Sequence, residues 1–202
     1  MNKKLIFSAL VAGAALTSTD LSAQLSKNSG FMLNAHLQGS SISVEDEDGE
    51  TGIGAGLTAG YNFTESLGLY LTLDGASIEP EGEDEPVGLG HVDLGLRYTF
   101  GSTASKLRPY LNAAVGAAAL VQEIEDEDTG ETGDLSLSGG AFTLGGGVQY
   151  FFSPRLALDA AIQGSAGKFT QLSFDGDDVD LEDDEQFSFN TARVQVGLTW
   201  HP

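Results

Sequence analysis

A strict two-residue alternation is the feature that most constrains this chain. Between Gly52 and Phe63, apolar side chains occupy every second position, and glycine, threonine and asparagine fill the positions between them. Successive side chains of a β-strand point to opposite faces, so this segment forms a strand with one apolar and one small or polar face. The pattern recurs about eight times along the chain, and the last copy ends at Trp200. The sequence therefore predicts an all-β fold.

The connections between the patterned segments alternate in length. Short turns follow the second, fourth and sixth segments, and longer acidic stretches follow the first, third, fifth and seventh. An even number of strands with tight turns at one end and long loops at the other indicates an all-β, eight-stranded antiparallel up-and-down transmembrane β-barrel. The predicted strands cover residues 30–43, 53–64, 67–78, 88–100, 109–121, 137–152, 155–167 and 188–200.

The N-terminus carries the features of a secretory signal peptide. Two lysines, Lys3 and Lys4, precede an apolar stretch of 12 residues from Leu5 to Leu16, which is shorter than the roughly 20 residues that a membrane-spanning helix needs. Leu21-Ser22-Ala23 fits a small-x-small cleavage pattern. We expect residues 1–23 to be a signal peptide and residues 24–202 to form one outer-membrane barrel domain, exported with both termini in the periplasm.

Negative charge is concentrated between the predicted strands. The net charge is −21, and 25 of the 30 acidic residues lie in four stretches, 45–50, 79–85, 123–134 and 175–185. This balance argues against nucleic acid as a partner. Since the spacing misses that of an EF-hand loop, we expect at most weak, collective binding of divalent cations. The weak metal candidates are Asp175, Asp177, Asp178, Asp180, Glu125, Asp126, Glu127 and Asp128.

The aromatic residues of the apolar face gather near one end of the strands. A ring of amphipathic side chains is what a bilayer interface selects, so we expect the apolar face to point outward into lipid. The alternative is a periplasmic, lipocalin-like binding barrel with its apolar face inside. The predicted girdle on the periplasmic side consists of Tyr61, Phe63, Tyr98, Phe100, Tyr150, Phe152 and Trp200.

At this point the chain resembles a known family. Its signal peptide, eight strands and terminal Val194-x-Val196-x-Leu198-x-Trp200 are similar to those of small Gram-negative outer-membrane barrels such as the OmpA transmembrane domain, OmpX and Ail-type proteins. The resemblance implies an outer-membrane location and insertion by the barrel-assembly machinery, which reads the terminal aromatic residue. Here His201 and Pro202 follow that residue, a departure from the pattern. The resemblance assigns no functional residues to this chain.

The polar face places charged residues inside the barrel. Eight-stranded barrels are narrow enough for side chains to fill them, and buried charges must pair. We expect Arg97 and Arg193 to neutralise aspartates there and to plug the barrel; a proton or ion path along the same residues is the alternative. The predicted interior charge cluster consists of Arg97, Arg193, Asp74, Asp93, Asp159 and His36.

Catalysis is poorly supported. The mature chain has three histidines, His36, His91 and His201, and no obvious Ser-His pair or nucleophile elbow. The chain has no cysteine, and we expect no cofactor. The expected function is therefore a non-enzymatic structural or interaction role that displays four acidic extracellular loops, with a narrow cation-selective channel as the alternative. Expected partners are outer-membrane lipid and lipopolysaccharide, and we expect a monomer.

Overall fold

The computed structural model describes residues 29–45, 49–79, 86–125, 132–174, 177–182 and 185–202. These residues form nine antiparallel strands connected in chain order. The strands are β1 (Gly30–Val44), β2 (Glu50–Asn62), β3 (Leu67–Ile78), β4 (Val87–Thr99), β5 (Leu107–Glu125), β6 (Thr132–Ser153), β7 (Leu156–Phe174), β8 (Asp177–Asp180) and β9 (Phe187–Trp200).

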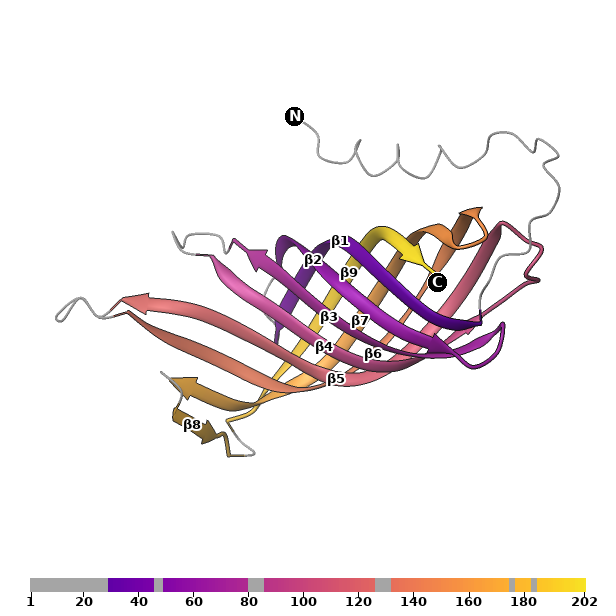
Figure 1. Cartoon of the computed structure of the whole chain (residues 1–202). Helices are drawn as coiled ribbons and strands as arrows, with labels where there is room; N and C mark the ends of the chain where they lie inside the picture. Colours follow the sequence, from indigo (N-terminus) through magenta and orange to yellow (C-terminus); the bar gives the residue numbers. More distant parts are fainter. Residues whose placement is uncertain (1–28, 46–48, 80–85, 126–131, 175–176, 183–184) are drawn as a thin grey trace.

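Eight of the strands close into one barrel, as the sequence predicts (Figure 1). Each of β1 to β7 pairs with the next, and β9 pairs with both β7 and β1. Trp200 at the end of β9 lies opposite Leu33 on one side and Leu156 on the other. The short strand β8 pairs with the last residues of β7, beyond the point where the β7–β9 pairing ends. The barrel thus has no free edge over most of its height.

Burial alternates along most of the length of β1, β3, β4, β5, β7 and β9. In β3 the pattern is strictly exposed and buried by turns from Leu67 to Ile78. The polar positions are buried inside the barrel, and the large apolar positions, such as Leu71, Leu94 and Val115, are exposed outside. The prediction that the apolar face points outward is therefore confirmed, and the lipocalin-like alternative is wrong. Among the described residues, no helix has the length and apolar character needed to cross a membrane.

The short connections are built on side-chain hydroxyls. Thr64 Oγ1 accepts hydrogen bonds from the backbone N–H groups of Ser66 (3.2 Å) and Leu67 (2.9 Å). Ser153 Oγ accepts in the same way from Arg155 (3.3 Å) and from Leu156. The two hairpins thus share one turn geometry, and a Tyr-x-Phe-Thr/Ser sequence leads into both of them. We call the end with these short connections the turn end, and the opposite end the loop end.

Several predicted strand limits were wrong, mostly at the loop end. β5 runs to Glu125, β6 starts at Thr132 and β7 reaches Phe174, so parts of two acidic stretches are strand rather than loop. β5 also starts at Leu107 rather than at Pro109. These strands extend beyond the band of outward-facing apolar residues. Acidic side chains there face water and are compatible with a sheet. In Figure 1, β5 and β6 reach farthest toward the loop end, on the left. The predicted signal peptide lies outside the described residues.

Candidate functional site

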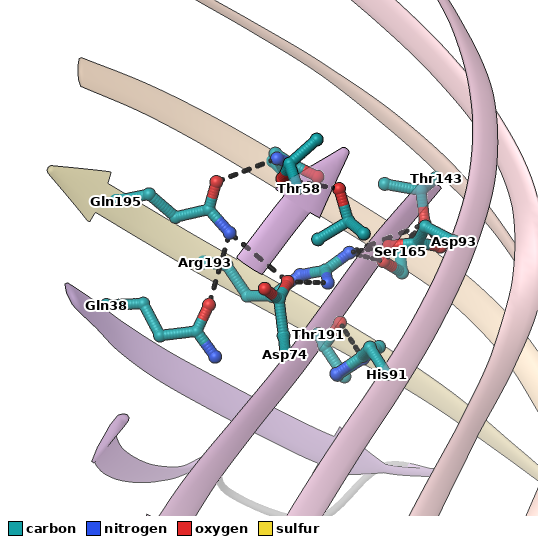
Figure 2. A network of polar contacts seen from close by, with 12 residues as sticks. Gln38, Thr58, Asp74, His91, Asp93, Thr143, Ser165, Thr191, Arg193 and Gln195 are labelled. Atoms are coloured by element: carbon teal, nitrogen blue, oxygen red, sulfur yellow. Dashed lines mark hydrogen bonds and ion pairs between the residues drawn. The ribbon is translucent and has the colours of Figure 1, made fainter. Parts of the chain in front are cut away.

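The middle of the barrel is filled by an ion network centred on Arg193, whose side chain is completely buried (Figure 2). Arg193 Nη1 donates to Asp74 Oδ2 at 2.7 Å, and Nη2 donates to Asp93 Oδ2 at 2.8 Å. Nη2 also lies 2.9 Å from Ser165 Oγ, and Thr143 Oγ1 donates to the other oxygen of Asp93 at 2.9 Å. One guanidinium therefore joins two aspartates from β3 and β4, which satisfies charges that would otherwise be costly inside the barrel.

His36 adds a further contact to the same network. Its Nε2 lies 2.7 Å from Asp74 Oδ1, and its Nδ1 lies 2.8 Å from Asn34 Oδ1. The amide nitrogen of Asn34 donates to Thr199 Oγ1 at 2.9 Å, so the oxygen is the group that faces the histidine. Both ring nitrogens thus lie within hydrogen-bond distance of a side-chain oxygen.

A glycine of β2 makes room for this pair. Gly56 lies directly opposite His36 on one side and Asp74 on the other. A Cβ atom at Gly56 would collide with Asp74 Oδ1 and would lie 2.5 Å from His36 Nε2. The alternation of glycine along β2 therefore serves close packing against interior side chains, not an open channel wall.

The expected role of Arg97 is wrong in its detail. Arg97 is buried, but no carboxylate of the described residues lies within ion-pair distance of it. Its guanidinium lies over the Tyr110 ring, 4.0 Å from the centroid, and 5.4 Å from the centroid of Tyr70. A weak contact of 3.8 Å joins it to Met32 Sδ. Aromatic rings from the neighbouring strands, rather than aspartates, contact Arg97 and stabilise it by cation–π interaction.

Asp159 is held by neutral donors instead. The Tyr110 hydroxyl donates to Asp159 Oδ1 at 2.7 Å, and Gln149 Nε2 donates to Oδ2 at 2.9 Å. Thr199 Oγ1 lies 3.3 Å from Oδ2. The predicted single cluster is thus two groups, one around Arg193 and one nearer the turn end. Tyr110 connects Arg97 to Asp159 within the second group. The two tyrosines were missed, although an aromatic residue on the polar face of a strand is the signal that could have found them.

Above the ion network, the interior becomes apolar. Phe169 and Phe189 are buried and stacked, with ring centroids 4.4 Å apart and an interplanar angle of 25°. We call this group and its buried neighbours the apolar plug. Sequence reasoning missed it because it expected polar side chains over the whole inner face. Its members are Ile42, Ile78, Leu89, Ala118, Phe169 and Phe189.

The plug marks a level at which the facing of the strands inverts. Toward the turn end, inward residues such as Asp74 are polar and outward residues such as Leu73 are apolar. Toward the loop end of the same strand, Ile78 points inward and Ser77 outward. Outward glycines, including Gly39 and Gly75, lie at the changeover. The apolar outer belt therefore ends at this level, and the parts of the strands beyond it have the facing of a water-exposed sheet.

All seven aromatic residues predicted for the girdle are exposed on the outer surface near the turn end. Phe31, which the prediction omitted, joins them through an edge contact with Tyr61, with ring centroids 5.0 Å apart. By contrast, His201 turns its side chain inward, where it is buried 5.4 Å from the Phe151 ring. His91 is also buried, and its Nε2 lies 3.2 Å from Thr191 Oγ1.

Most of the weak metal candidates cannot be placed. Asp175 and the three residues Asp126, Glu127 and Asp128 lie outside the described residues, as do the side chains of Glu125, Asp177 and Asp178. Asp180 is described, at the end of β8, and is exposed. Within the described part of the chain, no group of three or more His, Asp or Glu side chains is arranged to hold a metal ion.

Several solved structures share the fold of this barrel. Neisserial surface protein A superposes with a TM-score of 0.64 at 16% identity, over 85% of this chain and 97% of that chain. Ail of Yersinia pestis gives 0.51 at 14% identity, over 85% and 99%. OprG of Pseudomonas aeruginosa gives 0.51 at 14% identity, over 87% and 97%. Identities this low show a shared fold alone.

The sequence itself identifies the family. No curated protein matches the chain. The family model of the outer membrane protein beta-barrel domain, however, matches residues 7–201, which is nearly the whole chain. With its closed eight-stranded barrel and its outward apolar belt, the chain belongs to the outer membrane protein beta-barrel domain family and is a barrel of the outer membrane.

Proposed function

We propose that this protein is a non-conducting, non-enzymatic barrel that anchors and displays its loop end at the cell surface. The observation that carries the proposal is the filled interior. The Arg193 network fills the middle of the barrel, and the apolar plug lies above it. An ion that crossed would have to separate buried, hydrogen-bonded charges and then pass an apolar constriction, and both steps are costly.

Conductance in planar lipid bilayers tests this proposal. The purified, folded protein should add no sustained current over a protein-free bilayer. A double variant that removes the stacked rings, Phe169→Ala with Phe189→Ala, serves as the control for an opened plug. Steady, cation-selective openings of the unmodified protein would instead support a narrow cation channel and would overturn the proposal.

We also propose a topology in which residues 1–23 direct export and both mature termini face the periplasm. The asymmetry of the connections supports it, because outer-membrane barrels have short periplasmic turns and long outer loops. A protease site inserted at Gly130, between β5 and β6, should be cut on intact cells. The same site inserted at Gly101, in the turn between β4 and β5, should be protected, and the reverse pattern would contradict this orientation.

The buried histidines support the absence of catalysis. His36 is engaged by Asp74, and His91 lies against Thr191, both inside the barrel. The acidic loops are the distinctive surface, and we expect them to bind divalent cations weakly and to bridge to lipopolysaccharide phosphates. Calcium should then slow proteolysis of the loops at millimolar levels while the heat-resistant barrel stays unchanged. Cleavage that calcium does not slow would leave the acids as a solvating coat.

A further inference from the structure

The loop end carries a raised wall that continues above the apolar plug. It consists of residues 120–125, 132–137 and 171–174, the loop-end parts of β5, β6 and β7, together with β8. Residues 122–125 of β5 lie beyond the last pair with β4, residues 171–174 of β7 lie beyond the last pair with β9, and the strands pair with one another there. The wall is therefore a small antiparallel sheet that rises from one side of the barrel (Figure 1).

One face of the raised wall is apolar. Leu120, Leu137, Leu172 and Val179 lie directly opposite one another in a row across its four strands. The row continues to the buried Leu89 of the plug, so this face is the inner one. In the next row, Phe174 lies opposite Leu135, with Gln122 and Asp177 at the two ends of the row.

The opposite face of the raised wall is mostly polar. Ser136 lies opposite Ser173, and Ser138 lies opposite Gln171, all on the outward side. The sheet is thus amphipathic, and it turns its apolar side toward the space above the barrel. No described segment covers this side, since Phe174 and Val179 keep 55% and 59% of their surface exposed. Exposed apolar area of this kind above a membrane marks a docking surface.

The charge around this surface indicates what docks there. The exposed or half-buried carboxylates of the described loop-end residues have no ion-pair partner among the described nitrogens. Anionic lipids and fatty acids carry negative charge and would be repelled. A peptide with apolar side chains flanked by lysine or arginine matches both the apolar face and the acidic rim. The rim residues are Glu45, Glu50, Glu79, Glu182 and Glu185.

We propose that the inner face of the raised wall, with the acidic rim, binds a cationic amphipathic peptide segment of a partner protein. The apolar side chains of the segment pack on the row from Leu120 to Val179 and on Phe174. Its basic side chains face the rim carboxylates. This inference rests on the proposed function as a surface-displayed barrel and names the chemistry of its partner.

Binding of a fluorescent peptide to the protein in phosphatidylcholine nanodiscs tests the proposal. The probe alternates leucine and lysine and is long enough to cross the four strands. Two comparison peptides replace leucine by serine or lysine by glutamine, and empty nanodiscs give the background. The leucine–lysine peptide should bind at least about tenfold more tightly than either comparison peptide, because each lacks one of the two contributions. Its affinity should fall as salt rises.

A matched pair of variants locates the site. Phe174→Ser changes the inner face, and Val121→Ser changes an apolar residue with 41% of its surface exposed on the outer face of the same wall. Phe174→Ser should weaken binding about tenfold, and Val121→Ser should leave it unchanged. Retained heat resistance of both barrels in gel electrophoresis shows that they are folded.

Each of the following results would overturn the inference: equal weakening of binding by the two variants, binding of the leucine–glutamine peptide as tight as that of the probe, or equally tight binding of the serine–lysine peptide. The second result would assign the surface to neutral apolar ligands, and the third would leave only a diffuse acidic coat. A protein that binds no peptide and conducts no current would refute this inference alone. A protein that conducts current would refute the proposed function, whatever the peptide does.

Discussion

Removal of the Arg193 side chain should destabilise the barrel more than any other single interior change. Arg193→Met replaces the guanidinium by an apolar chain and leaves Asp74 and Asp93 without the contacts of 2.7 and 2.8 Å that neutralise them. Breaking a buried ion pair by removing one partner costs about 3–5 kcal/mol. Since each 1.4 kcal/mol is a factor of ten, roughly two to four orders of magnitude of the folding equilibrium should be lost.

Compensating variants distinguish the network from a general packing defect. Arg193→Met with Asp93→Asn removes the carboxylate of Asp93 and keeps the contact of 2.7 Å between His36 Nε2 and Asp74 Oδ1. Arg193→Met with Asp74→Asn instead leaves Asp93 without a cation and His36 without its carboxylate. The first double variant should recover about half or more of the lost stability, and the second should recover little, because coupled sites are not additive.

The free energy of unfolding can be measured by reversible denaturation in lipid vesicles. Trp200 is the single tryptophan of the chain and lies on the outer surface, so its fluorescence reports transfer from lipid to water. A loss of unfolding free energy below about 1 kcal/mol in Arg193→Met would show that the Arg193 ion pairs do not stabilise the barrel as argued. Equal recovery by the two double variants would contradict the assigned pairing.

Three further changes test facing and packing. Leu94→Arg, in the middle of the outer belt, should cost about 2–4 kcal/mol of unfolding free energy, while Val179→Arg on the raised wall should cost about 0.5 kcal/mol or less; similar costs would contradict the assigned membrane level. Gly56→Ala should lower the temperature at which the folded form is lost on gels, whereas Gly39→Ala, where a Cβ meets nothing within 4 Å, should leave it unchanged or slightly higher. Tyr110→Phe removes a hydroxyl donor from a buried carboxylate and should cost about 1–3 kcal/mol, measured by the same unfolding assay; an unchanged value would show that water replaces the hydroxyl.

The barrel could be predicted because its evidence is local. Alternation from Ile53 to Phe63 fixes a strand and its two faces, and the spacing of turns fixes the order of strands. The loop-end extensions could not be predicted in this way. Their acidic residues resemble those of a loop. The facing of apolar residues also inverts there: Leu137 and Phe174 point inward, whereas the apolar residues nearer the turn end of the same strands point outward.

The interior contacts depend on information that a single strand does not contain. Arg97 and Asp159 were predicted to lie inside the barrel, and both are buried. The register of β3, β4 and β5 determines which side chains contact Arg97, because it brings Tyr70 and Tyr110 beside it. Pairing of Arg193 with two aspartates likewise depends on strands that lie far apart in the sequence.

The position of Arg193 on β9 has a consequence for the order of folding. Asp74 and Asp93 are separated from it by 119 and 100 residues, and β9 is the strand that joins β7 to β1. Until this last strand is in place, the two aspartates lack their guanidinium, so an incomplete barrel is penalised. A slip of β9 by two residues would preserve its facing but would carry Arg193 past both carboxylates. Closure in the correct register and neutralisation of the interior are thus a single, late and cooperative event.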